Sequence, residues 1–147
     1  GADDAAEATA RLLQEVTPGN YSCSACLFTA RAVRAALVEK MPKRVKSASK
    51  RSELAATVIA EDGEKAICAA QRFPTNPYID KTTERYRDIE ELRTGKQSLT
   101  SEMFRLLESS AAAKAEISRV CQAVVGSFAD EVIRRAKAHK GRRIFGA

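Results

Sequence analysis

Apolar residues recur at every third or fourth position in several parts of the chain, which is the spacing of one face of an α-helix. The clearest case begins at Ser22 or Cys23 and ends at Met41, because Pro42 cannot continue a helix. The apolar stripe of this helix, which we expect to face the core, consists of Cys26, Ala30, Val33, Leu37 and Met41.

The same periodicity predicts four further helices, over residues 5–16, 53–72, 83–92 and from residue 98 or 100 to 138. Asp62-Gly63 lies inside one of them and is expected to bend or split it, since glycine costs about 1 kcal/mol there relative to alanine. The sequence also allows a break in the last helical region at Ser109-Ser110. The stripe beyond that break consists of Ile117, Val120, Cys121, Val124, Phe128 and Val132.

Val, Ile and Phe never alternate with polar residues over the length of a strand, which argues against a β-sandwich or barrel. The predicted fold is therefore all-α, a bundle of four to six helices. We expect one helical domain over residues 21–141, an N-terminal helix and linker over 1–20, and a basic tail over 142–147. No stretch reaches the ~20 apolar residues that span a bilayer, so the chain is not expected to cross a membrane.

The formal net charge is +6, and basic residues gather in two clusters that suit acidic protein surfaces or phosphate groups. One cluster lies between residues 134 and 143. Base stacking would need aromatic residues interleaved with the cations, and neither cluster has this pattern, so nucleic acid is disfavoured as a partner. The other cluster, on a linker predicted over residues 42–52, is the expected contact surface and consists of Lys43, Arg44, Lys46, Lys50 and Arg51.

Four cysteines carry the most information: Cys23, Cys26, Cys68 and Cys121. They permit a disulfide framework, but four cysteines allow three pairings and the sequence does not choose among them. A bridge between Cys68 and Cys121 would close a loop of about 53 residues and stabilise the fold by about 4 kcal/mol. Cys23 and Cys26 have the spacing of thioredoxin-type redox motifs, but the accompanying βαβ pattern is missing. A zinc site is disfavoured because structural zinc sites usually have two close ligand pairs.

Three segments resemble, in order and spacing, parts of Canopy-type saposin-like domains: Cys23-Ser-Ala-Cys26 with the helix that follows, Glu64-Lys-Ala-Ile-Cys68, and residues 117–133. The resemblance covers roughly residues 23–133 and implies a saposin-like helical bundle in which a disulfide joins Cys68 to Cys121. It also implies two later cysteines as partners for Cys23 and Cys26, and the sequence has none after Cys121. Either the natural chain continues beyond Ala147 or this chain lacks that second bridge. Cys23 and Cys26 are then expected to be free, to bridge each other or to bond a partner.

The resemblance implies a non-enzymatic, chaperone-like adaptor that binds client proteins in the lumen of the endoplasmic reticulum. The alternative is a permanent accessory subunit of a large photosynthetic or respiratory complex, peripheral to a membrane and facing the thylakoid lumen or mitochondrial intermembrane space. A thiol oxidoreductase that uses Cys23 and Cys26 ranks third. Lipid binding ranks low, because alanine replaces much of the Leu, Ile and Phe of an apolar leaf. His139 is the only histidine and no phosphate-binding glycine loop occurs, so no catalytic residue, metal or cofactor is expected.

Overall fold

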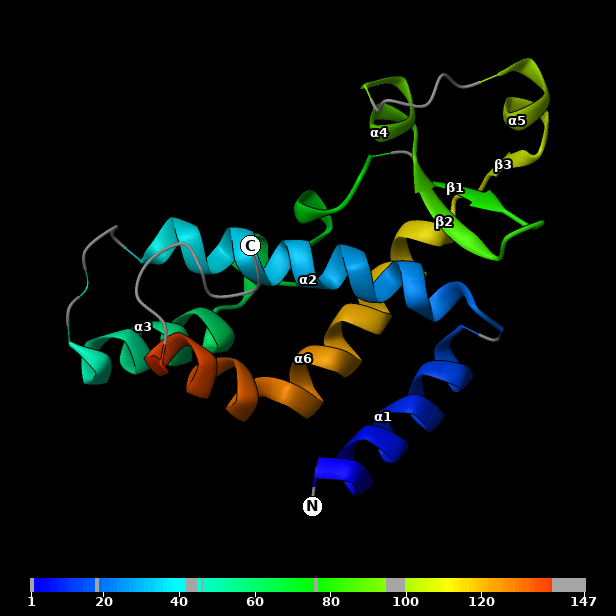
Figure 1. Cartoon of the computed structure of the whole chain (residues 1–147). Coiled ribbons are helices and arrows are strands. Elements are labelled where there is room, and N and C mark those ends of the chain that lie inside the picture. Colours follow the sequence, from blue (N-terminus) through cyan, green and yellow to red (C-terminus); the bar gives the residue numbers. More distant parts are fainter. Residues whose placement is uncertain are drawn as a thin grey trace.

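The computed structural model describes residues 2–17, 19–41, 45, 47–75, 77–94 and 100–138. Over these residues the chain is mostly helical and carries a small antiparallel sheet (Figure 1). The helices are α1 (Ala2–Val16), α2 (Tyr21–Lys40), α3 (Ala48–Ala60), α4 (Ile89–Thr94), α5 (Ser101–Arg105) and α6 (Ala113–Ala138), with 3-10 turns over Gly63–Lys65 and Ala70–Arg72. The strands are β1 (Pro77–Asp80), β2 (Arg85–Asp88) and β3 (Leu107–Ser109), in the order β2-β1-β3. The prediction of a strictly all-α fold is therefore wrong.

Strand β2 and helix α4 occupy the region where the sequence predicted one charged helix over residues 83–92. Glu84 has a φ of 53°, a left-handed conformation in the turn that joins β1 to β2. Ile79 on β1 and Tyr86 on β2 lie opposite each other in the sheet, and both pack against the core. Burial of these two side chains favours paired strands over the local preference for a helix.

Helix α3 begins and ends earlier than the predicted range 53–72. The Ser47 hydroxyl accepts a hydrogen bond from the Lys50 backbone N–H at 3.2 Å, which caps the start of the helix. The end comes at Ala60, and Gly63 follows with a φ of +68°, a conformation that a helix does not contain. The helix therefore ends before Asp62-Gly63, and the predicted second half, up to residue 72, contains 3-10 turns in place of an α-helix. The linker before α3 is shorter than predicted.

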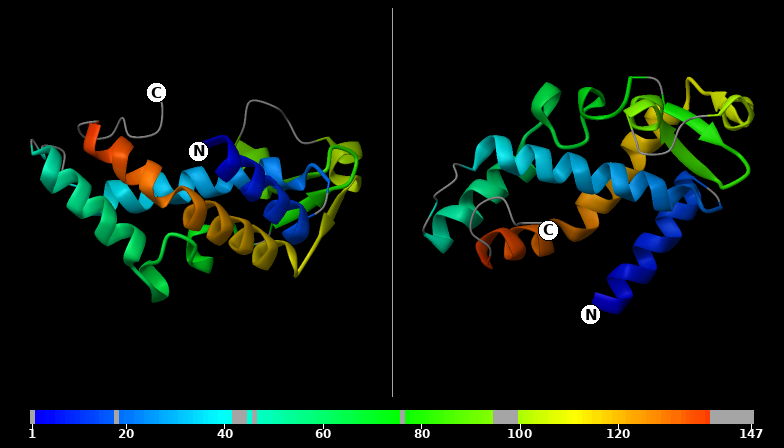
Figure 2. Two further views of the ribbon diagram at one scale, coloured as in Figure 1. Left: turned by 90° about the horizontal axis from the view of Figure 1, so that it is seen from below. Right: turned by 45° about the horizontal axis from the view of Figure 1, so that its top comes forward.

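Helix α6 lies at the centre of the fold and packs against α1, α2 and α3, while the sheet lies near the N-terminal end of α2 (Figures 1 and 2). It is kinked at Phe128, where φ is −115° and ψ is 17°. Ile117 and Val120 of α6 form the core together with Leu37 of α2 and Val58 of α3. These four side chains are almost completely excluded from solvent.

The buried face of α2 differs from the predicted stripe. Ala30 is exposed and Cys26 is half-buried, so the helix is rotated relative to our expectation. The buried face contains three alanines, and alanine lets a neighbouring helix approach closely. Its members are Ser24, Ala25, Phe28, Thr29, Ala32, Val33, Ala36 and Leu37.

A buried hydrogen-bond network joins the ends of α1, α2, β2 and α6. The Tyr86 hydroxyl donates to the Glu116 carboxylate at 2.6 Å and hydrogen-bonds the Thr17 hydroxyl at 3.2 Å. The Tyr86 backbone N–H donates to Ser24 Oγ at 2.8 Å. Burial, and then the hydrogen bond to Glu116, raises the pKa of Tyr86 well above its ordinary value.

Candidate interaction surfaces and cysteine sites

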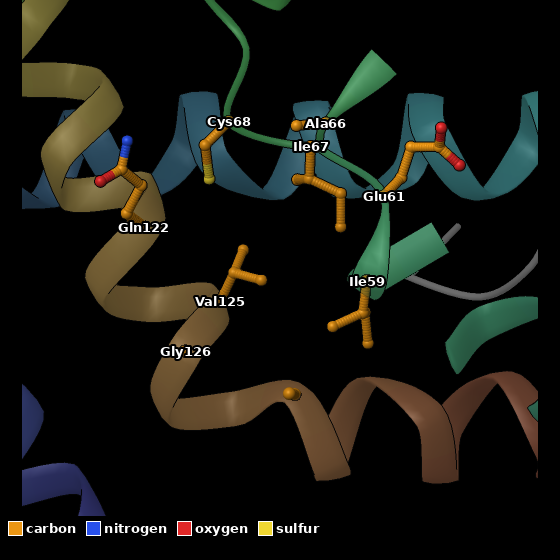
Figure 3. Close-up of a pocket in the computed structure, with 9 residues that line it drawn as sticks. Ile59, Glu61, Ala66, Ile67, Cys68, Gln122, Val125 and Gly126 are labelled. Atoms are coloured by element: carbon orange, nitrogen blue, oxygen red, sulfur yellow. The ribbon is translucent and has the colours of Figure 1, made fainter. Parts of the chain in front are cut away.

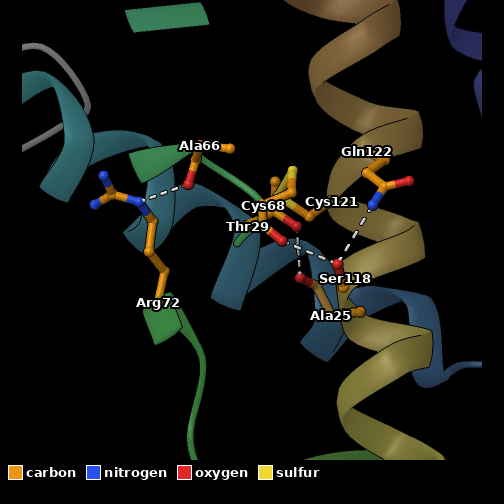
Figure 4. Close-up of a disulfide and its surroundings, with 8 residues drawn as sticks. All are labelled: Ala25, Thr29, Ala66, Cys68, Arg72, Ser118, Cys121 and Gln122. Carbon is orange, nitrogen blue, oxygen red and sulfur yellow. Dashed lines mark hydrogen bonds between the residues drawn. A yellow bond between two sulfur atoms is a disulfide. The ribbon is translucent and has the colours of Figure 1, made fainter. Parts of the chain in front are cut away.

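The structure contains a disulfide between Cys68 and Cys121, with a Cα–Cα distance of 5.6 Å (Figure 4). Cys121 lies on the buried face of α6, whereas Cys68 lies in the irregular segment between the two 3-10 turns and not in a helix. The Ser118 hydroxyl donates to the Cys68 carbonyl at 2.9 Å, one helical turn before Cys121. The disulfide and this hydrogen bond therefore fasten the segment after α3 to the central helix.

Arg72 also fastens the segment after α3, by joining it to helix α2. Its Nε donates to the Ala66 carbonyl at 2.8 Å, and its two terminal nitrogens bond both oxygens of Glu39 on α2 at 3.2 and 3.1 Å (Figure 4 shows the first bond). The Arg72 side chain is only 12% exposed. Glu39 is more exposed, at 60%, but the two parallel hydrogen bonds fix the orientation of the Arg72 guanidinium.

Cys23 and Cys26 lie in the first two turns of α2 and are not bonded to each other. Cys23 is exposed and Cys26 is half-buried. Burial, and then the neighbouring Cys23, raises the pKa of Cys26. Of the two thiols, only Cys23 is presented to solvent. Among the described residues, no group of three or more His, Cys, Asp or Glu side chains gathers in a way that could hold a metal ion.

The predicted basic contact surface is only partly described. Lys43, Arg44 and Lys46 lie outside the described residues, as does His139. Lys50 is exposed on α3, with its amine 3.7 Å from the Glu53 carboxylate.

Arg51 corrects the prediction of a basic contact surface, because its side chain is only 4% exposed. It donates to the backbone carbonyls of Val45, Ala136 and Lys137, at distances between 2.6 and 3.2 Å. The last two carbonyls belong to the final turn of α6, where a helix leaves its carbonyls without partners. Arg51 therefore stabilises the end of α6 and is not available to a partner.

The outward face of α2 carries a line of exposed, mainly apolar residues. Leu27 is 52% exposed and Val38 is 39% exposed. Their spacing, together with that of the other members, places them on one side of the helix over about 22 Å. We call this the α2 face, and it consists of Cys23, Leu27, Ala30, Arg34 and Val38.

A second apolar surface lies on the sheet and was missed by the sequence analysis. The rings of Tyr78 on β1 and Phe104 on α5 lie 6.3 Å apart, and Phe104 is 49% exposed. Leu106, just before β3, is 53% exposed. Arg85 and Arg87 of β2 add positive charge. These residues come from three separate segments, so no local pattern indicates that they meet.

A pocket of about 310 Å³ lies beneath the disulfide, between the end of α3 and the middle of α6 (Figure 3). Ile59, Ile67 and Val125 form its apolar wall. Glu61 and Gln122 supply polar groups to the lining. The pocket lies next to the kink in α6, and the disulfide joins the segment after α3, which supplies part of the lining, to α6, which supplies another part.

None of the described helices is long and apolar enough to cross a membrane. No protein-family model, curated protein or solved structure matches the chain. Function is therefore inferred from the chemistry of the exposed surfaces.

Proposed function

We propose that the chain is a non-enzymatic protein-interaction module of an oxidising compartment, similar in role to the Canopy-type adaptors that its sequence resembles. The observation that carries the proposal is the α2 face, where Leu27 and Val38 are exposed on the same side of a 20-residue helix that also contacts the sheet. Single exposed apolar residues are common on soluble proteins, but an aligned series on one helix is typical of helix-mediated recognition. The disulfide supports an oxidising compartment, since cytosolic disulfides are rare.

The charge on the α2 face favours a protein partner over a lipid surface or a second copy of the chain. Arg34 lies between Leu27 and Val38 and makes no ion pair with the described residues. Burying this guanidinium among acyl chains without a partner would be costly. The α2 face itself contains no carboxylate, so a second copy of it would bring a second arginine and no acidic partner to the contact. A partner helix with acidic residues beside its apolar ones would avoid both costs.

The test is co-purification of the tagged full chain from its native host, comparing wild type with the Leu27→Asp/Val38→Asp double variant. We expect the double variant to lose its partner, with at least a tenfold weaker association, because two charges would be buried at the contact. Leu12→Asp is the matched control, since Leu12 is 40% exposed on α1, outside the α2 face. Equal recovery of partners by wild type and double variant would contradict the proposal.

The second candidate function is a permanent accessory subunit of a large organellar complex. The specific observation in its favour is the additional exposed apolar surface around Phe104 and Leu106. A subunit that stays in one assembly buries several surfaces, whereas an exchanging adaptor needs one. Recovery at fixed stoichiometry with a single assembly would favour the subunit, and recovery with several partners in varying amounts would favour the adaptor.

A further inference from the structure

The solvent side of the sheet brings together aromatic rings and arginines from distant parts of the sequence. Ile79 and Tyr86 lie opposite each other and face the core. Because side chains alternate along a strand, the next pair in register, Tyr78 and Arg87, faces the other way. Phe104 of α5 lies against Tyr78, with an angle of 49° between the ring planes. This outer side, with Arg85, is called the sheet face below, together with Phe104 and with Leu106 in the turn between α5 and β3.

Among the described residues, some arginines are paired with carboxylates, whereas those of the sheet face, like Arg34 of the α2 face, are not. Arg31, Arg72 and Arg134 each pair with a carboxylate, of Glu91, Glu39 and Glu131 respectively. Arg85 and Arg87 form no ion pair with the described residues. Arg87 is half-buried, and its strand register places it on the same side of the sheet as Tyr78.

The nearest acid on the sheet face is already occupied by its own turn. Asp80 accepts hydrogen bonds from the backbone N–H groups of Thr82 and Thr83 at 3.0 and 3.3 Å. Burial alone would raise the pKa of Asp80, but these hydrogen bonds and the charge of Arg87 lower it. Asp80 Oδ1 therefore serves the turn, and the described residues show no ion pair between Asp80 and Arg87, so the Arg87 donors remain open to a ligand.

We propose that the sheet face binds a short segment of a partner protein in which an acidic residue stands next to an aromatic or aliphatic one. The carboxylate pairs with the guanidinium of Arg87, whose planar donors match a carboxylate. The apolar side chain packs on Phe104 and Leu106. This inference rests on the proposed role in protein binding, but it uses residues outside α2.

Two features of the sheet face favour such a segment over single-stranded nucleic acid. The Asp80 carboxylate lies opposite Arg85 in register and would repel a continuous line of phosphates, whereas a single carboxylate can bind at Arg87. The two rings are tilted by 49° and are not parallel, so two successive stacked bases cannot lie flat on both. A discrete acidic and apolar pair fits both features.

The test measures fluorescence anisotropy of a labelled short peptide of alternating glutamate and phenylalanine, added to the full chain. One twin peptide has lysine in place of glutamate, and another has serine in place of phenylalanine. We expect the first peptide to bind at least tenfold more tightly than either twin. Arg87→Ala and Phe104→Ala should each weaken its binding by about tenfold. If Phe104→Ala does not fold, as judged by circular dichroism, Leu106→Ser takes its place.

The matched controls are Leu27→Asp and Arg134→Ala, which change an equally exposed leucine and an arginine outside the sheet face. Both should bind the peptide as wild type does. Equal binding of the lysine twin, or no effect of Arg87→Ala, would overturn the proposal. A short oligouridylate tests whether nucleic acid competes for the same surface. If it displaces the peptide, and Phe104→Ala weakens its binding, the proposal is overturned in favour of nucleic acid. Leu27→Asp disables only the α2 face. If this variant loses its partners but still binds the peptide, the two surfaces act independently. Failure of this inference can then be distinguished from failure of the proposed function.

Discussion

Arg51 is the residue whose position changes the interpretation of the basic cluster most. Its guanidinium bonds three backbone carbonyls and is nearly excluded from solvent. Arg51→Met should lower the free energy of unfolding by about 2–4 kcal/mol, because buried carbonyls lose charged donors. The measurement is urea unfolding of the full chain. Lys50→Met, next to it but exposed, is the control and should change stability by less than about 0.5 kcal/mol. If Arg51→Met were as stable as Lys50→Met, the buried contacts of Arg51 would not contribute to stability, and Arg51 would be assigned to the predicted contact surface.

Tyr86 provides a test that depends on pH. Its pKa in the folded chain is raised above the ordinary value of 10.0 by burial and by the hydrogen bond to Glu116. The stability that the protonated phenol contributes is fully present below pH 10, and it falls as the pH rises above 10, because the unfolded chain then loses a proton that the folded chain retains. Tyr86→Phe should cost about 1–3 kcal/mol at neutral pH, and this difference from wild type should shrink above pH 10.

The measurement for Tyr86 is urea unfolding across pH 7 to about 11, with Cys23 and Cys26 both replaced by serine so that thiol exchange at high pH does not intervene. A difference between Tyr86→Phe and its parent that stays constant over this range would contradict the account of the buried phenol.

At the scale of elements, the disulfide and Arg72 together hold the irregular segment after α3. Replacing Cys68 and Cys121 with alanine removes a link between residues 53 positions apart, which should lower the free energy of unfolding by about 4 kcal/mol. Urea unfolding measures this loss. Hydrogen exchange should show faster opening of residues 61–72 than of α2, because the segment then keeps the Arg72 and Ser118 hydrogen bonds and the burial of Ile67 but no covalent link to α6. Uniformly faster exchange in both regions would mean that the bridge is not a local fastening.

The elements that the sequence predicted well are those whose own periodicity determines them. The bounds of α2 agree with the prediction to within about two residues, and Ile117, Val120, Cys121 and Val132 of α6 are buried as expected. The prediction missed the sheet, because strands of three and four residues are too short to show alternation. Tyr86 lies within a charged run that suits an exposed helix, and only its contacts with α1, α2 and α6 explain its burial.

The candidate sites divide in the same way. The cysteines could be singled out from sequence because their chemistry is rare and their number small. The sheet face could not, since Tyr78, Arg87 and Phe104 meet only through strand pairing and the placement of α5. The prediction for the basic cluster was wrong at Arg51 because charge alone does not indicate whether a guanidinium meets solvent or the end of another helix.

At the scale of the whole molecule, the α2 face and the sheet face are two exposed surfaces of different chemistry. One is an apolar line on a helix with one unpaired arginine, and the other is a pair of rings beside two arginines. Because both are joined in one small fold, a partner that engages both would gain affinity beyond that of either contact. Combining Leu27→Asp with Arg87→Ala should then weaken binding of such a partner by more than either change alone, as measured by co-purification. A partner lost only through Leu27→Asp would show that the two sites act separately.

The proposed function makes the chain a disulfide-stapled module of an oxidising compartment. The most direct test is non-reducing peptide mapping by mass spectrometry on protein from its native source, with free thiols blocked at lysis. The account predicts a linked peptide pair containing Cys68 and Cys121. It also predicts a blocking group on Cys23 and Cys26, or a bond from Cys23 to a partner, and no bond between these two cysteines. If blocking groups appeared on all four cysteines, the bridge would be absent in the cell and the proposal of an oxidising compartment would fall.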